Sequence, residues 1–352
     1  MELTKQQLAA VQTTASKVVV VSAPASGKTR VLTERIKHLL DIGVDPHKIV
    51  AITFTVSASQ EMAERLGNPR GLFIGTIHAY ANYILKASGI DTSVVLDDEK
   101  FDQLFPLVEK HLECIQPVEH LLLDEAQDST ELQFNFLLKI VRPKNYFLVG
   151  DYRQSIFLFA GADPQYLMDL MNQEDVTTYA LTENYRNGSA ILDFAKSIIN
   201  LAGYEYRDWS VAKRGERGRV VEVEYSPIAI AKTIKKYGNF GSWFVLTRTN
   251  DQLEEIMGYL QKYEVPCVSF KRAQINNKEL YTLMKQDKVK VLTIHTSKGL
   301  EADNVVVIGA KFYNLEEKCI SYVAATRARN LLVWARMPTK VRRANMVSNW
   351  EK

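Results

Sequence analysis

The stretch that most constrains the fold lies near the start of the chain, in the residues VVVVSAPASGKT (18–29). Four consecutive valines predict a short buried strand, because β-branched residues favour strands and the run is too short to span a membrane. A turn of small residues follows, and Lys28 and Thr29 then open a segment with helical periodicity. Its apolar residues share one helical face: Leu32, Ile36, Leu39 and Leu40. A strand, a tight loop and a helix in this order predict an α/β fold.

The loop between this strand and this helix is predicted to bind phosphate. Its backbone N–H groups and those of the helix N-terminus would converge on an anion, Lys28 adds a positive charge, and the Thr29 hydroxyl can hold Mg²⁺. The predicted nucleotide-binding residues of this stretch are Ser22, Ala23, Pro24, Ala25, Ser26, Gly27, Lys28, Thr29 and Arg30. The pattern has glycine where Ser22 stands, so an ordinary strand-to-helix turn is the alternative from this stretch alone.

Composition sets the limits of the class. A chain of 352 residues predicts about two domains, and 46% hydrophobic and 24% charged residues are typical of a globular protein. The net charge of +3 neither requires nor opposes a polyanionic partner. Three scattered cysteines, no signal-like N-terminus and no long apolar run predict a cytoplasmic protein without membrane contact.

Short β-branched runs alternate with helical patterns along the whole chain, which predicts parallel sheets flanked by helices. In the first half the expected strands are 18–21, 49–54, 72–75, 120–123 and 146–150. In the second half they are 219–224, 243–247, 289–294, 304–308 and 331–334. We therefore expect two sheets of about five strands, in two α/β domains that meet near Leu181.

A second chemical signal is LLLDEAQDS (121–129), in which a strand delivers Asp124 and Glu125 at its carboxyl end. Ligands bind at this edge of open α/β sheets. The first carboxylate suits a Mg²⁺ ligand, and the second suits orienting or deprotonating an attacking water. An isolated Asp–Glu pair is often only a charge pair at a helix N-terminus. Together with the phosphate loop it favours nucleotide hydrolysis, and a glutamate beside the metal carboxylate favours water over a kinase acceptor.

Further motifs follow in a fixed order. They are LTKQQLAAV (3–11), ITFTVSASQEMAERL (52–66), GTIHAY (75–80), LVGDYRQSIFLFAGA (148–162), LTENYRNGSAIL (181–192), LTRTN (246–250), VLTIHTSKGLEADNVVV (291–307) and YVAATRARNLLVW (322–334). With the phosphate loop and the acidic pair, this set resembles the UvrD/Rep-like superfamily 1 DNA helicases from residue 3 to about residue 334. The resemblance implies two tandem RecA-like P-loop domains, residues 1–180 and 181–352, with the ATP site in the cleft between them. The intervals that hold accessory domains in larger relatives are short here, at about 81–117 and 268–288.

The resemblance also implies ATP and Mg²⁺ as cofactors and assigns roles around them. Lys28, Asp124, Glu125 and Gln154 would be catalytic residues of the first domain, with Thr29 and Asp124 as Mg²⁺ ligands. Arg186 and Arg327 would reach the γ-phosphate from the second domain. Gln7 would read the adenine edge, Tyr185 would stack on adenine, and Glu301 would contact the ribose.

Contacts with single-stranded DNA are implied for Thr53, Phe54, Thr55, Thr76, His78, Phe157, Phe159, His295 and Thr296, with Lys298 near them. Phe157 and Phe159 occupy positions on which bases stack, although core packing is the alternative for both rings. The family usually has Asn-Lys where Val56 and Ser57 stand. It usually has Trp at Phe159 and Arg at Ala160, which predicts a weaker grip on DNA. The loosely spaced His111, Cys114 and His120 are interpreted as surface or core residues, and not as zinc ligands.

The function implied by the resemblance is ATP-driven helicase or translocase movement along single-stranded DNA, in the 3′ to 5′ direction. One alternative is a DNA-stimulated ATPase or translocase that does not unwind duplex alone. Another is a DNA-binding subunit of a larger replication or repair complex, which the presence of all six catalytic residues disfavours. The expected partners are single-stranded DNA, single-strand/duplex junctions, and replication or repair proteins. The expected state is a monomer or weak oligomer.

Overall fold

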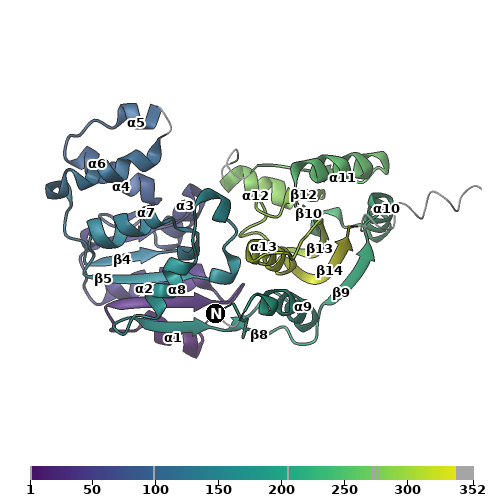
Figure 1. The fold of residues 1–352 in the computed structure, drawn as a ribbon, viewed down its shortest axis with the longest axis horizontal. Helices are drawn as coiled ribbons and strands as arrows, with labels where there is room; N and C mark the ends of the chain where they lie inside the picture. Colours follow the sequence, from purple (N-terminus) through teal and green to yellow (C-terminus); the bar gives the residue numbers. More distant parts are fainter. Residues whose placement is uncertain (1, 98–99, 204–205, 272–274, 276, 338–352) are drawn as a thin grey trace, which may run out of the picture. The chain divides into compact units, whose positions relative to one another are not determined.

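The computed structural model describes residues 2–97, 100–203, 206–271, 275 and 277–337. The chain divides into two compact units, Met1–Thr182 and Glu183–Lys352. Each unit holds one parallel sheet with helices packed along it, as Figure 1 shows. Residues 272–274 and 276 of the short insertion expected at 268–288, and residues 338–352 of the expected second domain, lie outside the described residues.

The sheet of the first unit has six parallel strands in the order β3-β2-β4-β5-β1-β6. Its strands are β1 (Lys17–Ser22), β2 (Ile49–Ile52), β3 (Phe73–Gly75), β4 (His120–Leu123), β5 (Asn145–Gly150) and β6 (Thr177–Leu181). Strand β1 lies between β5 and β6, and its residues from Val18 onward are all buried. Burial on both faces explains why this strand is an unbroken apolar run without polar alternation.

The helices of the first unit follow the strands. They are α1 (Lys5–Val11), α2 (Lys28–Asp41), α3 (Val56–Arg65), α4 (Ile77–Ala87), α5 (Ser93–Asp97), α6 (Leu104–Glu109), α7 (Glu131–Phe134) and α8 (Gln165–Met171). Helix α2 begins at Lys28, as the sequence predicts, and packs Leu32, Ile36 and Leu39 into the same core as the β1 valines.

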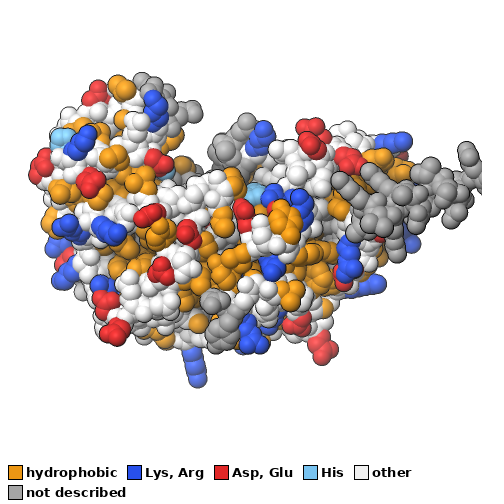
Figure 2. Space-filling model, in the orientation of Figure 1, with side chains coloured by type: hydrophobic (Ala, Val, Ile, Leu, Met, Phe, Trp, Pro, Cys, Tyr) orange, Lys and Arg blue, Asp and Glu red, His pale blue; other side chains and the backbone are white. Residues whose placement is uncertain are grey.

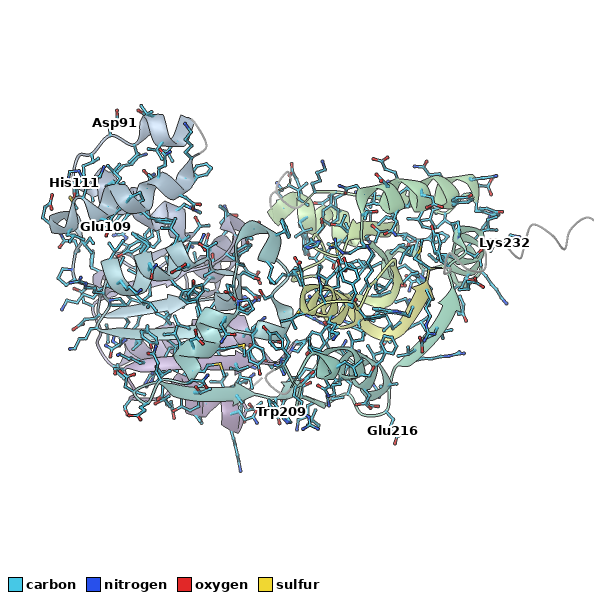
Figure 3. The ribbon with its side chains drawn as sticks, viewed as in Figure 1. Asp91, Glu109, His111, Trp209, Glu216 and Lys232 are labelled. Carbon is cyan, nitrogen blue, oxygen red and sulfur yellow. The ribbon has the colours of Figure 1, made fainter. Side chains whose placement is uncertain are left out.

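Short 3₁₀ turns and one π-helical segment complete the first unit. The 3₁₀ turns are η1 (Pro46–Lys48), η2 (Phe101–Gln103), η3 (Leu112–Cys114), η4 (Ala126–Asp128), η6 (Tyr152–Gln154) and η7 (Leu158–Ala160), and the π-helix is η5 (Asn135–Ile140). Between α4 and β4, in the interval of the expected first insertion, the chain forms α5, η2, α6 and η3. Figure 3 labels Asp91, Glu109 and His111 on this segment. Phe105 anchors it, because this fully buried ring lies 4.7 Å from the ring of Phe136.

The sheet of the second unit also has six parallel strands, in the order β11-β12-β10-β13-β14-β9. Its strands are β9 (Arg219–Glu224), β10 (Trp243–Thr247), β11 (Cys267–Val268), β12 (Val289–Thr293), β13 (Ala302–Ile308) and β14 (Ala328–Arg336). A separate two-stranded pair joins β7 (Glu183–Asn184) to β8 (Val211–Ala212). The helices are α9 (Ser189–Ile199), α10 (Pro227–Tyr237), α11 (Asn250–Lys262), α12 (Asn277–Lys285) and α13 (Leu315–Ala325), with η8 (Asn200–Ala202) and η9 (Phe240–Ser242).

The predicted α/β class with parallel sheets is confirmed, and the strand prediction is wrong in several details. The strand prediction misses β6, which ends at Leu181, the expected junction of the two domains. It is an edge strand with exposed side chains, so it lacks the buried apolar run that identifies the other strands. Strand β11 is too short to give a pattern, so the second sheet also has six strands where about five are expected. Strand β2 ends at Ile52, before Thr53 and Phe54.

One face of the molecule carries both positively and negatively charged side chains. On the face that Figure 2 shows, Lys and Arg are interspersed with Asp and Glu, in keeping with the small net charge. Among the described helices, none is long and apolar enough to cross a membrane.

Candidate functional site

The loop between β1 and α2 has the backbone that an anion site needs. Ala25 and Gly27 adopt left-handed conformations, with φ of 56° and 90°, and α2 starts directly after them. A Cβ at Gly27 would lie 2.7 Å from Nε2 of Gln7, so only glycine fits there without displacing Gln7. The Ser26 hydroxyl is buried and has no hydrogen-bond partner among the described residues. An orphaned hydroxyl beside a helix N-terminus fits a phosphate oxygen.

Gln7 holds this loop from the side of α1. Its Oε1 accepts from the Thr4 backbone N–H at 3.0 Å, and its Nε2 donates to the Ser26 carbonyl at 2.8 Å. The first bond uses one of the two lone pairs of the amide oxygen, and the second uses one of the two N–H groups. One lone pair and one N–H group therefore remain for a further contact. The adenine contact of Gln7 therefore stays a prediction that this geometry permits. Ser22, at the position where glycine is usual, donates to the Gly150 carbonyl at 3.3 Å.

The acidic pair lies against the phosphate loop, because parallel strands bring the ends of β1 and β4 to one edge of the sheet. Oγ1 of Thr29 donates to Oδ2 of Asp124 at 3.3 Å, and Nζ of Lys28 lies 3.1 Å from Oε2 of Glu125. Glu125 has a φ of 50°, a left-handed conformation that is strained for a residue with a side chain. The structure thus brings together four of the predicted site residues at the place where the sequence predicts them.

Charge at this edge favours a divalent cation. Burial, followed by the charge of Glu125, raises the pKa of Asp124 to about 6. Burial would lower the pKa of Lys28, but Glu125, Asp151 and Asp124 together outweigh it and raise that pKa. Three carboxylates therefore surround one ammonium group. A hydroxyl and a carboxylate in contact are hard oxygen ligands of the kind that Mg²⁺ prefers, so Thr29 and Asp124 fit this ion.

Sequence reasoning missed two residues of this site, Gln127 and Asp151. Both are fully buried, and the Oε1 of Gln127 accepts from the Asp151 backbone N–H at 2.9 Å. Asp151 in turn accepts from Nε2 of Gln154 at 2.7 Å, which places this predicted catalytic residue in the same network. Their positions in the sequence could have indicated them, because both follow buried parallel strands. The carboxyl ends of such strands meet at one edge of the sheet, where ligands bind.

Aromatic rings gather beside the same edge. Phe54 stacks on Phe157 with ring centroids 5.2 Å apart, and Phe157 lies 6.0 Å from Phe159. Phe54 is 43% exposed and Phe159 is 71% exposed, whereas Phe157 is partly buried. Core packing therefore does not account for Phe159, and the three rings form an apolar shelf at the surface.

The predicted DNA-contacting threonines cap helices. Thr55 accepts from the Ala58 N–H and caps α3, and Thr76 accepts from the Ala79 N–H and caps α4. The Thr53 hydroxyl donates to the Thr55 carbonyl at 3.0 Å. A pocket of about 200 Å³ brings this group together, and its lining includes Thr53, Phe54, Thr76, His78 and Asp124. Four of the candidate DNA residues of the first unit and one candidate metal ligand, Asp124, thus line one cavity.

His78 has a partner that the sequence did not indicate. Its Nε2 lies 2.8 Å from Oδ1 of Asp102, and its ring stacks on Phe105 at 5.1 Å. Asp102 belongs to η2, in the interval of the expected insertion. The group predicted to bind a DNA phosphate is therefore paired with a carboxylate of the same unit.

In the second unit, Arg186 and Glu301 come together. Nε of Arg186 donates to Glu301, its Nη1 donates to the Thr326 carbonyl at 3.2 Å, and Arg329 also pairs with Glu301. Burial would raise the pKa of Glu301, but Arg186 and Arg329 outweigh it and lower that pKa. Glu301, predicted to contact the ribose, is thus the counter-ion of the predicted γ-phosphate arginine.

Most of the remaining predicted residues of the second unit have hydrogen-bond partners within that unit. Arg327 is 2% exposed, and its guanidinium donates to the carbonyls of Val323 and Leu300. Tyr185 is 42% exposed and its hydroxyl donates to Glu183 at 2.7 Å. The predicted DNA residues His295 and Thr296 are partly buried and follow β12, where the Thr296 hydroxyl bonds that of Thr293 at 2.9 Å.

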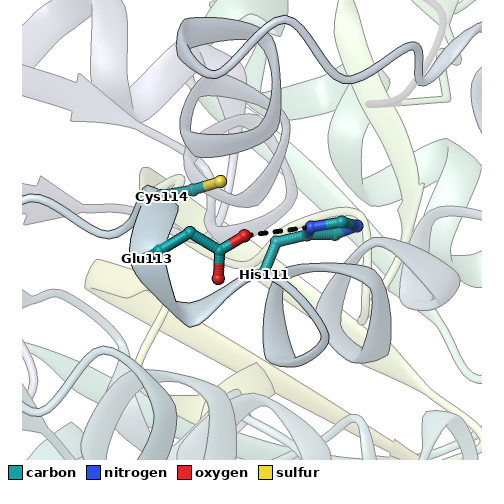
Figure 4. Close-up of side chains that lie close together, drawn as sticks. All are labelled: His111, Glu113 and Cys114. Carbon is teal, nitrogen blue, oxygen red and sulfur yellow. Dashed lines mark hydrogen bonds and ion pairs between the residues drawn. The ribbon is translucent and has the colours of Figure 1, made fainter.

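Three potential metal ligands lie close together, two on η3 and one on the residue before it, as Figure 4 shows. Nδ1 of His111 is 3.3 Å from the carboxylate of Glu113, and Cys114 completes the group. No further His, Cys, Asp or Glu of the described residues joins them. They come from a single turn, and the Glu113 side chain is 73% exposed. Neighbouring surface side chains commonly lie in this way, and we assign no metal to them.

Comparison with known proteins agrees with this geometry. The UvrD/REP helicase N-terminal domain matches residues 3–113 and 99–175, and the UvrD-like helicase C-terminal domain matches residues 269–337. The chain belongs to the UvrD/Rep-like superfamily 1 helicases. Its two units are accordingly RecA-like P-loop folds in tandem.

Individual relatives carry helicase names. The chain is 26% identical to the ATP-dependent DNA helicase PcrA of Leuconostoc citreum, over 75% of this chain and 49% of that protein. It is 25% identical to a probable DNA helicase of Mycoplasma pneumoniae, over 94% of this chain and 82% of that protein. It is 25% identical to the putative ATP-dependent DNA helicase YjcD of Bacillus subtilis, over 77% of this chain and 49% of that protein. The alignment thus spans about half the length of two of these three relatives.

Proposed function

We propose that this protein is an ATP-dependent DNA helicase or translocase that moves along single-stranded DNA in the 3′ to 5′ direction. The observation that carries the proposal is the contact of Lys28 and Thr29 with Glu125 and Asp124, beside the orphaned Ser26 hydroxyl. The direction of movement is taken from the family. The names of two relatives, an ATP-dependent DNA helicase and a probable DNA helicase, support the DNA substrate.

Under this proposal, the predicted site residues of both units have defined roles in ATP hydrolysis. The loop N–H groups and Lys28 bind the β- and γ-phosphates, and Gln7 meets the adenine. Thr29 and Asp124 hold Mg²⁺, which when bound neutralises charge on the phosphates. Glu125 orients the attacking water and accepts its proton, and Gln154 senses the γ-phosphate. Arg186 and Arg327 stabilise the charge of the transition state, while Tyr185 and Glu301 contact the nucleoside.

DNA would lie on the aromatic shelf of Phe54, Phe157 and Phe159. Stacking contributes about 1–3 kcal/mol per base and does not depend on the base sequence, which suits a motor on arbitrary DNA. Thr53, Thr55, Thr76 and His78 would contact phosphates in the first unit, and His295 and Thr296 would do so in the second. We expect single strands and single-strand/duplex junctions as ligands, in company with replication or repair proteins.

The decisive experiment measures ATP hydrolysis with and without single-stranded DNA, together with strand displacement on 3′-tailed and 5′-tailed duplexes. We expect hydrolysis that requires Mg²⁺, increases with DNA, and is lost in Lys28→Ala. Displacement from the 3′ tail alone would support the helicase and its direction. Absence of both activities in the wild type would contradict the proposal.

A second candidate is a translocase that hydrolyses ATP on single-stranded DNA without unwinding duplex by itself. It is favoured by the short segment between α4 and β4, whose described residues form two short α-helices and two 3₁₀ turns in the place of an accessory domain. DNA-stimulated hydrolysis without displacement from either tail would select this candidate.

A further inference from the structure

Gln127 connects the two loops of the candidate nucleotide site in the first unit. It is fully buried in η4, directly after β4. Its Nε2 donates to Oε2 of Glu125 at 2.6 Å and to Oδ2 of Asp128 at 3.2 Å. Its Oε1 accepts from the Asp151 backbone N–H at 2.9 Å. Both N–H groups and the oxygen of the amide are therefore used, and they tie the loop after β4 to the first residue after β5.

The network continues from Asp151 to the residue predicted to sense the γ-phosphate. Asp151 accepts from Nε2 of Gln154 at 2.7 Å and from Nε of Arg153 at 2.6 Å. Ser155 adds a second tie, because its hydroxyl donates to the Gln127 backbone carbonyl at 3.1 Å. A continuous path of hydrogen bonds thus runs from Glu125 through Gln127 and Asp151 to Gln154.

Packing holds the Gln127 side chain in this position. A Cβ at Gly150 would lie 2.7 Å from Oε1 of Gln127 and 2.9 Å from a methyl carbon of Leu167. Gly150 therefore makes the space that the amide fills. At the other end, the Glu125 oxygen that accepts from Gln127 also lies 3.1 Å from Nζ of Lys28, so two donors fix this carboxylate.

We propose that Gln127 is a positioning residue for ATP hydrolysis, which fixes the carboxylate of Glu125 relative to Gln154 without touching ATP itself. This inference rests on the proposed function, in which Glu125 acts on the water and Gln154 on the γ-phosphate. The neutral amide suits this place, because its two N–H groups donate to the carboxylates of Glu125 and Asp128 while its oxygen accepts from the Asp151 backbone N–H. A carboxylate here would lose both donated bonds and add a negative charge beside Glu125.

The test compares three variants of the full chain. Gln127→Glu keeps the size of the side chain and the acceptor for Asp151 but cannot donate to Glu125. Gln127→Leu removes all three side-chain bonds. Ser155→Ala is the matched control, because it removes a hydroxyl that is equally buried in the same network and leaves the Gln127–Glu125 bond intact. The readouts are kcat and KM for ATP with saturating single-stranded DNA, the Kd of a fluorescent ADP, and the Tm followed by circular dichroism.

We expect Gln127→Glu to lower kcat by about tenfold to a hundredfold, which is less than the roughly 10²–10⁴-fold that the base itself contributes, because Glu125 remains present but is misplaced. The Kd for ADP should stay within about twofold of the wild type, because Lys28 and the loop are unchanged. Ser155→Ala should keep kcat within about threefold of the wild type. In a Glu125→Gln background, Gln127→Glu should have almost no further effect on kcat, because residues that act as one unit are not additive.

Each contrary result has a distinct meaning. A wild type without ATPase activity would refute the proposed function. An active wild type whose kcat survives Gln127→Glu would overturn the positioning role alone. A parallel loss of kcat, ADP binding and Tm, or an equal loss in the Glu125→Gln background, would show that Gln127 only supports the fold and would also overturn it.

Discussion

At the scale of single residues, Glu125 offers the sharpest test of the chemistry. Its carboxylate contacts Lys28 and Gln127 and is adjacent to the buried Asp124. We expect Glu125→Gln to lower kcat by about 10²–10⁴-fold, because the amide cannot accept a proton from water. KM should change little, since phosphate binding depends on Lys28 and the loop. Steady-state ATPase assays measure both quantities, with the exposed Glu109→Gln as control, and a variant that kept its kcat would exclude Glu125 as the base.

Asp102 is a second residue whose contact predicts a measurable effect. It pairs with Nε2 of His78, a residue predicted to contact a DNA phosphate, and its negative charge would repel that phosphate. We expect Asp102→Asn to tighten single-stranded DNA binding about two- to fivefold, the range of an exposed ion pair. Fluorescence anisotropy at fixed salt measures this change.

The matched background for this prediction is His78→Ala. If Asp102 acts through His78, its substitution should lose most of its effect there, since only a longer-range charge term remains. An equal gain of affinity in both backgrounds would mean that Asp102 acts by net charge and not by occupying His78.

At the scale of elements, the ion pair between Arg248 and Glu317 links the end of β10 to the first turn of α13. Nη2 of Arg248 lies 2.8 Å from Glu317, whose side chain is 4% exposed, whereas that of Arg248 is 24% exposed. Arg248→Met should therefore cost about 3–5 kcal/mol, because it removes the cation that pairs with a buried carboxylate and leaves it with the hydrogen bond from the Tyr313 hydroxyl at 3.3 Å. Glu317→Gln should cost less, since Arg248 can still reach water. Urea unfolding followed by tryptophan fluorescence compares the two, and equal losses would contradict the asymmetry.

The same pair predicts a dependence on acid. Burial would raise the pKa of Glu317, but Arg248 outweighs it and lowers that pKa below 4.5. A depressed pKa in the folded state contributes stability that is complete above pH 4.5 and declines as the pH falls through the folded value. Arg248→Met should lack this decline. Unfolding free energies measured at a series of pH values below 5 would test this, with parallel curves for the two proteins as the contrary result.

How far the sequence predicts these elements depends on burial. The runs of β1, β4 and β10 are buried on both faces, so their composition alone identifies them. Strand β6 is an exposed edge and gives no such signal. The same reasoning holds for the site: parallel order predicts that Lys28 meets Glu125. The role of Gln127 depends on which way its side chain points, and neither periodicity nor spacing contains that information.

The ion pair between Arg186 and Glu301 shows a related limit of prediction from sequence. Resemblance assigns Arg186 to phosphate and Glu301 to ribose, yet the two side chains are paired with each other. A motif states which residue types recur in order, and it does not state which of them are neighbours. Pairing follows from the fold, because the turn after β7 and the start of β13 meet only in three dimensions.

At the scale of the whole molecule, the tryptophans provide a way to observe the two units separately. All four belong to residues 183–352, and three of them, Trp209 and the buried Trp243 and Trp334, lie in the described part of the second unit. We therefore expect tryptophan fluorescence to report on the second unit. Far-ultraviolet circular dichroism reports on both units. Ligand that binds the folded state raises its stability by about 2.7 kcal/mol at a hundredfold excess over Kd. The two signals can therefore show which unit a nucleotide stabilises.

This separation tests whether both units act on one ATP. Mg²⁺-ADP lacks the γ-phosphate and would reach the second unit only through the nucleoside contacts of Tyr185 and Glu301, so we expect it to stabilise the first unit and to shift the tryptophan transition only slightly. A non-hydrolysable ATP analogue should shift the tryptophan transition further, because Arg186 and Arg327 would engage its γ-phosphate. Arg186→Ala should abolish that second shift and keep the first, whereas Lys28→Ala should abolish both. An analogue that never moved the tryptophan transition in the wild type would refute the joint action of the two units.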